Sequence, residues 1–228
     1  MAVIIWSHGQ KGGVGKSMTA TALVELAPEK PMVVETDESA PDVARRYRGH
    51  GYPGVSVAIQ SADSPADALS DLMSEIEAAV AAIVIVNLPA AAGSVVDAYA
   101  AEIGDIARQL GRKLVVTYSV GSGVDSASSA RACARSGLAS VADIRVAVVN
   151  SYFGATHRLW DDQSREAWDG AEVVLPALAD RVVARIRSID APLAMIAAGS
   201  AGDMPLVDRA LLGRWLRECS PLADAVYG

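Results

Sequence analysis

The segment Gln10-Lys11-Gly12-Gly13-Val14-Gly15-Lys16-Ser17 lies between an apolar run and a helical pattern near the N-terminus. Residues Ala2–Trp6 predict a buried strand, and Lys16–Leu26 predicts a helix. A glycine-rich loop between a strand and a helix is the setting of a phosphate-binding loop, because glycines let backbone N–H groups approach phosphate oxygens closely. The residues expected to contact a nucleotide here are Lys11, Gly12, Gly13, Val14, Gly15, Lys16, Ser17 and Met18.

The residue types at the end of this loop fit phosphate chemistry. The positive end of the following helix attracts an anion. Lys16 is placed to reach the terminal phosphates, and the Ser17 hydroxyl is placed to ligate Mg²⁺. The alternative is a glycine-rich turn that binds nothing, and the flanking strand and helix argue against it.

Composition indicates a folded and acidic protein. The chain has 228 residues, of which 51% are hydrophobic, and this excludes a disordered chain. There are 20 Lys and Arg against 27 Asp and Glu, giving a formal net charge of −7. This balance argues against a protein that coats nucleic acid by bulk charge.

Cysteine and histidine usage indicates a cytoplasmic protein without a structural metal. Cys133 and Cys219 do not form a disulfide framework in a chain of this length, and no signal peptide is visible. The three histidines, His8, His50 and His157, lack the spacing of metal ligands. The uncharged stretch 78–96 contains Asn, Pro and Gly, so it predicts a buried strand and a loop rather than a membrane span.

Val- and Ile-rich runs alternate with helical patterns, which predicts a mostly parallel sheet flanked by helices in one domain, residues 1–228. The expected strands are Ala2–Trp6, Met32–Glu35, Ile83–Val86, Leu114–Tyr118, Ile144–Val149 and Glu172–Leu175. The expected helices are Lys16–Leu26, Ala66–Ala79, Val95–Leu110, Val124–Arg135, Arg181–Arg187 and about Leu206–Leu216, the last one docking onto the sheet.

Two departures from the ordinary loop pattern carry a resemblance. Gln10 stands where the first glycine would be, and Lys11 is an additional lysine. This combination resembles the deviant Walker A loop of the ParA/MinD-type ATPases. The resemblance implies a P-loop fold, ATP and Mg²⁺ as ligands, and a homodimer that encloses ATP. It also implies that Lys11 crosses the dimer interface to the partner's phosphates and that Lys11, Lys16 and Asp37 serve catalysis.

The acidic turn after the second expected strand fits the same resemblance. By position, Glu35 would hold the water shell of Mg²⁺ and Asp37 would orient the attacking water. Asn87 stands where the family usually has an aspartate, and it would contact the metal through water without adding charge. We therefore expect slow hydrolysis, and we expect Asn87→Asp to raise it. A solvated acidic turn is the alternative for 35–37.

Later segments match the family more loosely. Asn150 ends the fifth expected strand, where the family places an asparagine that binds adenine, and Pro176 ends the sixth, where the base is enclosed. A loop start or a local cap is the alternative for Asn150.

The form Asn87-Leu88-Pro89-Ala90 resembles the plasmid partition and conjugation branch, including StbB-like proteins. This implies a role in segregation, positioning or transfer of plasmid DNA, with a DNA-site-binding adaptor protein as partner. Arginines at 45, 46 and 48 and at 181, 185 and 187 would contact DNA nonspecifically or form solvated helix faces. The alternatives are a nucleotide-gated binding module with little hydrolysis and a MinD-like membrane-positioning ATPase, although a membrane partner is the less favoured.

Overall fold

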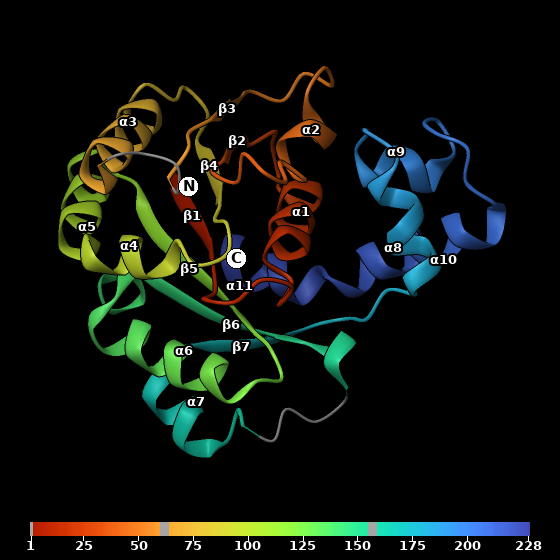
Figure 1. Ribbon diagram of the computed structural model, residues 1–228. Coiled ribbons are helices and arrows are strands. Elements are labelled where there is room, and N and C mark those ends of the chain that lie inside the picture. Colours follow the sequence, from red (N-terminus) through yellow and green to blue (C-terminus); the bar gives the residue numbers. More distant parts are fainter. Residues whose placement is uncertain (1, 60–63, 155–158) are drawn as a thin grey trace.

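A seven-stranded parallel sheet forms the centre of the protein (Figure 1). The computed structural model describes residues 2–59, 64–154 and 159–228. The strand order is β3-β2-β4-β1-β5-β6-β7, so β1 lies in the middle. The strands are β1 (Val3–His8), β2 (Met32–Glu35), β3 (Gly54–Ser56), β4 (Ile83–Asn87), β5 (Lys113–Val120), β6 (Ile144–Asn150) and β7 (Ala171–Leu175).

Helices cover both faces of this sheet. One face carries α3 (Pro65–Glu77), α4 (Gly93–Ala98), α5 (Ala100–Gln109), α6 (Val124–Ser136) and α7 (Asp162–Trp168). The other carries α1 (Lys16–Leu26), α2 (Ala44–Tyr47), α8 (Asp180–Arg187), α9 (Leu193–Ala198), α10 (Leu206–Glu218) and α11 (Ser220–Tyr227). Two short 3-10 helices, η1 (Leu138–Val141) and η2 (Ser151–Phe153), follow α6 and β6.

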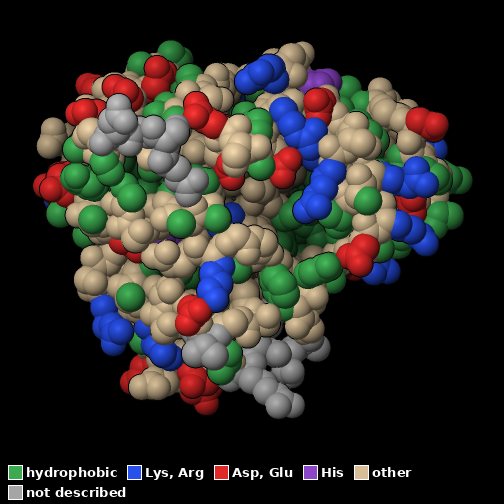
Figure 2. All heavy atoms as spheres, in the orientation of Figure 1, with side chains coloured by type: hydrophobic (Ala, Val, Ile, Leu, Met, Phe, Trp, Pro, Cys, Tyr) green, Lys and Arg blue, Asp and Glu red, His purple; other side chains and the backbone are tan. Residues whose placement is uncertain are grey.

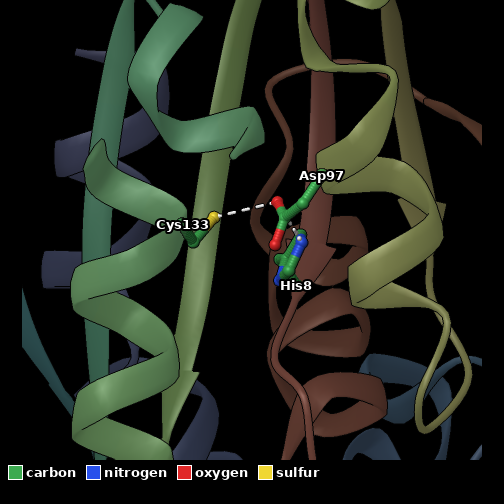
Figure 3. Close-up of side chains that lie close together, drawn as sticks. All are labelled: His8, Asp97 and Cys133. Atoms are coloured by element: carbon green, nitrogen blue, oxygen red, sulfur yellow. Dashed lines mark hydrogen bonds and ion pairs between the residues drawn. The ribbon is translucent and has the colours of Figure 1, made fainter. Parts of the chain in front are cut away.

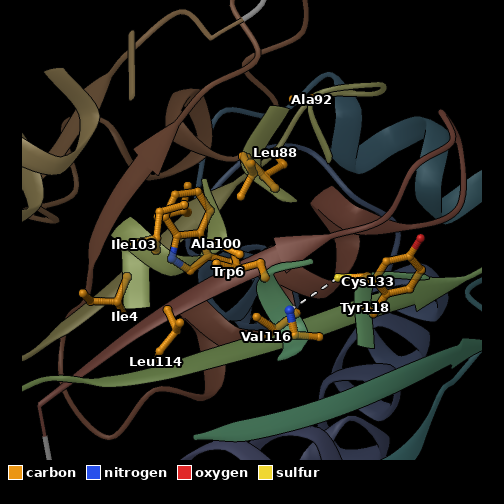
Figure 4. Close-up of a cluster of buried hydrophobic side chains, with 14 of the residues drawn as sticks. Ile4, Trp6, Leu88, Ala92, Ala100, Ile103, Leu114, Val116, Tyr118 and Cys133 are labelled. Atoms are coloured by element: carbon orange, nitrogen blue, oxygen red, sulfur yellow. Dashed lines mark hydrogen bonds between the residues drawn. The ribbon is translucent and has the colours of Figure 1, made fainter. Parts of the chain in front are cut away.

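Apolar residues on consecutive positions of the strands supply a core on each side of the sheet. In β1, Ile4 and Trp6 face the α3–α7 side, and Val3 and Ile5 face the α1 side. Figure 4 shows the first of these cores, where Trp6 lies among Leu88, which follows β4, and side chains of β5 and α5. Because helices cover both faces of the central strand β1, all six of its residues are buried and the alternating polar pattern of a half-exposed strand is absent from it.

The predicted parallel sheet and its six strands are confirmed, and the structure differs from the prediction in the details below. Strand β3, three residues long, was not expected, and neither were α2, α7, α9 and α11. The predicted helix 95–110 is two helices, α4 and α5, because Tyr99 between them has φ −108° and ψ 22° instead of helical values. Ser64 caps α3, since its hydroxyl accepts from Asp67 N at 3.3 Å.

Helices α8, α9 and α10 form an arm beside α1 (Figure 1). The buried carboxylate of Asp208 in α10 accepts from Arg181 Nε at 2.8 Å and pairs with Arg185 Nε at 3.0 Å in α8. This fastens two helices of the arm to each other. Two arginines of the second predicted basic stretch therefore bind a carboxylate of the chain itself.

The predicted docking of the last helix onto the sheet is only partly right. Helix α10 packs chiefly against α9, and the following helix α11 contacts β6 and β7. Leu206 and Val207 at the start of α10 are exposed. Within the described ranges, none of the helices combines the length and apolar character that crossing a bilayer requires.

Candidate functional site

The loop between β1 and α1 has the backbone that its glycines allow. Gly13 and Gly15 have φ values of +76° and +107°, which L side chains rarely adopt. Gly15 is the residue that precedes α1, so the first helical N–H groups follow it directly. The loop therefore presents backbone donors at the N-terminus of an 11-residue helix, which is an arrangement suited to an anion.

Side chains on the inner side hold this loop in place. Ser7 Oγ donates to Lys16 O at 2.9 Å. The side chain of Val14 is buried between Gly9 and Gly121. A Cβ added at Gly121, just after β5, would lie 2.8 Å from Val14 Cγ1. Among the loop residues predicted to contact the nucleotide, Val14 therefore has a side chain that packs into the protein interior and holds the loop in place.

Lys16 lies inside the loop and Lys11 lies outside it. The Lys16 side chain is 6% exposed, and its Nζ donates to Lys11 O at 2.7 Å. Burial lowers the pKa of Lys16 to about 8, and the charge of Asp37 opposes this shift. A phosphate that replaced the carbonyl as partner of Nζ would supply the negative charge that the buried ammonium lacks.

The ammonium of Lys11 points away from Lys16. Its Nζ pairs with Asp125 Oδ2 at 2.6 Å, at the start of α6, and both side chains are at least half exposed. An exposed pair of this kind contributes no more than about 1 kcal/mol. Lys11 is therefore held in place loosely, on the surface of the phosphate loop.

Glu35 is at the centre of a hydrogen-bond network between β2, β4 and α2. Its side chain is 1% exposed, and Oε2 accepts from the backbone N–H groups of Val43 and Ala44 at 3.1 and 3.3 Å. Oε1 accepts from Asp37 N at 3.3 Å and from Asn87 Nδ2 at 2.8 Å. Burial raises the pKa of Glu35, and these hydrogen bonds oppose the shift. The carboxylate thus binds the acidic turn to the start of α2.

Asn87 connects this network to the loop. Its Nδ2 also approaches Ser17 Oγ at 3.4 Å, so an amide bridges the predicted metal ligand and Glu35. Asn87 Oδ1 is buried and has no hydrogen-bond partner among the described residues. A buried carbonyl oxygen without a donor is an acceptor still free to bind a water molecule or an ion.

Asp37 lies at the rim of a cleft next to the loop. Its Oδ1 accepts from Ser39 N, Ser39 Oγ and Ala40 N at 3.1, 2.6 and 3.0 Å, which closes the turn after β2. The cleft has a volume of about 620 Å³ and is lined by the phosphate loop, Asp37 and the inner side of the arm. Figure 2 shows the surface hollowed between the arm and the body.

The other end of the cleft is formed by the predicted base-binding residues. Asn150 Nδ2 donates to Val14 O at 3.1 Å, and its Oδ1 accepts from Tyr152 N at 3.0 Å. Pro176 O accepts from Trp215 Nε1 of α10 at 2.7 Å. Asn150 and Pro176 therefore lie in the same cleft as the loop, and Trp215 fixes the second of them.

Two residues of the cleft, Arg46 and Trp215, have roles that the sequence did not predict. The expectation that Arg46 contacts DNA or solvent is wrong, because Arg46 is 5% exposed and donates to the carbonyls of Ile186, Ile189 and Ala191. Arg45 of the same helix binds Asp190 and Asp42. In the sequence, Trp215 is only one of several apolar residues of the last expected helix. Neither role can be predicted from the sequence, because each depends on segments that are far apart in the chain. Arg46 joins α2 to the arm, and Trp215 joins α10 to the residue that follows β7.

Comparison with known proteins identifies the fold. No protein-family model matches the chain. The signal recognition particle receptor FtsY of Elizabethkingia anophelis superposes with a TM-score of 0.50 at 14% identity, over 95% of this chain and 66% of that one. The chain therefore spans about two thirds of the length of that receptor. This likeness shows the fold alone, a single α/β domain with a parallel sheet flanked by helices as in P-loop NTPases.

Two further similarities complete the comparison. Protein MobD of Acidithiobacillus ferrooxidans is 27% identical over 227 residues, covering 96% of this chain and 95% of MobD. A nucleotide-binding protein of Archaeoglobus fulgidus, solved in complex with ADP, aligns with a TM-score of 0.47 at 12% identity, over 82% of this chain and 85% of that one.

The buried Lys16 predicts a pH dependence of nucleotide binding. Phosphate favours the charged ammonium, which the protein without ligand loses as pH rises through about 8. The Kd for a nucleoside triphosphate should therefore rise about tenfold between pH 7 and pH 9, with proton uptake on binding at pH 9. Isothermal titration in buffers of different ionisation enthalpy measures both. In Lys16→Arg the charge persists, so the dependence should vanish; a flat wild-type profile contradicts the prediction.

The Glu35–Asn87 contact predicts the effect of a charge change on stability. Asn87→Asp places a second carboxylate at hydrogen-bond distance from buried Glu35, which should destabilise the fold by about 1–3 kcal/mol. In the double variant Glu35→Gln/Asn87→Asp, one carboxylate remains and the glutamine amide donates to it, so at least half of the loss should be recovered. Urea unfolding measures both variants. Equal stability of the two variants contradicts this account of the pair.

Proposed function

We propose that this chain is an ATP-binding and ATP-hydrolysing switch of the ParA/MinD type. Two copies enclose ATP and Mg²⁺ between them, and hydrolysis separates them. The switch acts in segregation, positioning or conjugative transfer of plasmid DNA, and its partner is a DNA-site-binding adaptor protein. Nonspecific DNA contact, where present, uses arginines exposed in the dimer.

The observation that supports this proposal most directly is that the two loop lysines differ in burial and in direction. Lys16 is buried beside the phosphate position, so it serves the nucleotide of its own chain. Lys11 is half exposed and is bound only at the surface, so its ammonium is available to a second copy. A loop that binds only the phosphates of its own nucleotide does not need a lysine that points away from them.

The oxygen donors next to the loop fit Mg²⁺. Ser17 Oγ lies at the end of the loop, and buried Asn87 Oδ1 has no partner among the described residues. Oxygen ligands and retained waters are what Mg²⁺ prefers. Mg²⁺, when bound, neutralises charge on the transferred phosphate. Ser17 would bind it directly, and Glu35 and Asn87 would act through water, with Glu35 held by its four hydrogen bonds.

The protein groups around the reacting phosphate have distinct tasks in this proposal. Lys16 stabilises the charge on the terminal phosphates. Asp37 orients the attacking water, and its Oδ1 stays committed to the turn that positions it. Asn150 and the segment at Pro176 hold the base at the other end of the cleft.

A second candidate is a nucleotide-gated binding module that hardly hydrolyses ATP. The observation that favours it is the neutral Asn87 beside Ser17, where a carboxylate would hold Mg²⁺ more strongly. In both candidates ATP controls an interaction, and they differ only in turnover. Measuring phosphate release with and without DNA or lipid vesicles separates them from each other and from a membrane-positioning role.

Lys11 predicts how the oligomeric state responds to ATP. Light scattering on a sizing column should show a wild-type monomer without nucleotide and a dimer with ATP and Mg²⁺. Lys11→Ala should weaken the dimer at least tenfold, because it removes an ammonium from the partner's phosphates.

Two matched variants control for loss of charge alone. Lys113→Ala removes another exposed lysine, at the start of β5, and should dimerise like wild type. Asp125→Asn releases Lys11 from an exposed pair and should strengthen the dimer by no more than about fivefold. If Lys11→Ala and Lys113→Ala dimerise equally well, the role of Lys11 in the switch is excluded.

Asp37 predicts a loss of turnover without a loss of binding. Asp37→Asn keeps the Oδ1 that closes the turn but removes the charge that orients water, so kcat should fall on the order of 10²-fold. ATP affinity should change less than about threefold, as measured by titration. Glu38→Gln, at the exposed neighbouring position, should leave kcat unchanged. An unchanged kcat in Asp37→Asn excludes its assigned role.

A further inference from the structure

Three side chains that could bind a metal meet below the phosphate loop, on the side of the sheet away from the cleft (Figure 3). His8 ends β1, Asp97 lies in α4 and Cys133 lies in α6. Asp97 Oδ1 is 3.1 Å from His8 Nε2 and 3.2 Å from Cys133 Sγ. The three ligand atoms all lie within 4.8 Å of one another. We call these residues the His8–Asp97–Cys133 cluster.

The chain makes room for this cluster with two glycines. A Cβ added at Gly93 would lie 2.8 Å from His8 Cε1, and one at Gly137 would overlap the Asp97 carboxylate. The ring of Tyr118 stacks on His8 with 5.1 Å between centroids. Three rigid elements therefore hold the side chains, and each side chain has little freedom to turn away.

Backbone donors orient two of the three ligand atoms. Leu138 N donates to Asp97 Oδ1 at 2.8 Å, and Ala139 N approaches Cys133 Sγ at 3.5 Å. Both donors belong to η1, directly after α6. N–H donors that point at a carboxylate and a sulfur are the outer contacts that metal ligands typically have.

The arrangement does not suit a cysteine nucleophile. The Asp97 carboxylate lies between the thiol and the imidazole. In the part of the chain that the structure describes, His8 and Cys133 each hydrogen-bond to Asp97 and not to each other, so His8 is not placed to remove the proton of Sγ. Cys133 is also 1% exposed, which excludes a substrate from its sulfur. One nitrogen, one oxygen and one sulfur donor this close together are a ligand set that suits a transition-metal ion.

We propose that the His8–Asp97–Cys133 cluster binds one divalent ion of the zinc type. Zn²⁺ prefers N, O and S ligands at about 2.0–2.3 Å in a tetrahedron, whose ligand atoms lie about 3.3–3.6 Å apart. The two distances to Asp97 Oδ1 are close to this value, and the His8–Cys133 separation shortens on binding. Cys133 binds as the thiolate, and its proton leaves to solvent. The fourth position belongs to water.

The ion would brace the base of the phosphate loop. His8 is followed directly by Gly9, so a fixed His8 fixes the point where the loop leaves β1. Binding through Nε2 moves the ring proton to Nδ1, which is buried and has no partner among the described residues. An unpaired donor weakens the complex, so the ion should be removable by a chelator.

The test uses the full chain, first stripped with a chelator and then titrated with Co²⁺ or Zn²⁺ in excess Mg²⁺. Wild type should bind one equivalent, and Co²⁺ should give a thiolate-to-cobalt absorption band. Cys133→Ser can still donate to Asp97 Oδ1, so it should keep the fold while its affinity falls at least about tenfold and the band disappears. Circular dichroism and thermal unfolding of the stripped proteins verify that the fold is kept.

Cys219→Ser is the matched control, because Cys219 is the other buried free cysteine and lies on the opposite side of the sheet. It should retain the band and an affinity within twofold of wild type. His50→Ala and His157→Ala test the other histidines and should also retain both. Equal binding by wild type and Cys133→Ser, a band that depends on Cys219, or no bound ion in folded wild type would overturn the proposal.

Discussion

The parallel register of β1, β2 and β4 is the constraint on which the site depends. Ser7 pairs in register with Asn87, and Asn87 pairs with Glu35, so three polar residues from separate strands meet at one edge of the sheet. Parallel strands end at the same edge, and loops leave from it. The phosphate loop follows β1 at this edge, between its neighbours β4 and β5. This placement of the strands brings Asn87 within reach of both Ser17 and Glu35.

From this edge, buried polar groups extend the site to the far end of the chain. Glu35 binds the start of α2, and Arg46 of α2 binds carbonyls in the last turn of α8 and just after it. Among the described residues, no carboxylate hydrogen-bonds to or pairs with this guanidinium, and burial lowers its pKa. Burying a guanidinium is costly, and the hydrogen bonds from its two terminal nitrogens to these carbonyls offset part of that cost, so the arm and α2 constrain each other. The acidic turn and the outer wall of the cleft are thus parts of one network.

The sequence predicts the strands and the loop well, since both signals are local. Runs of Val and Ile identify six strands, and the glycines identify the loop. The sequence does not predict features that depend on a contact with a residue far away along the chain. Strand β3 has three residues and exists through its pairing with β2, and Arg46 is an exposed arginine in any local reading. The His8–Asp97–Cys133 cluster has spacings of 89 and 36 residues, which no metal motif has.

The central position of β1 has a consequence for the order of folding during synthesis. Strand β1 leaves the ribosome before its partners β4 and β5, which end at residues 87 and 120. Its apolar residues, buried on both faces in the finished protein, therefore wait for more than half of the chain. Non-local pairing of this kind folds slowly and leaves apolar segments open to aggregation. Until residue 120 has emerged, the nascent chain depends on its cellular surroundings to remain unaggregated.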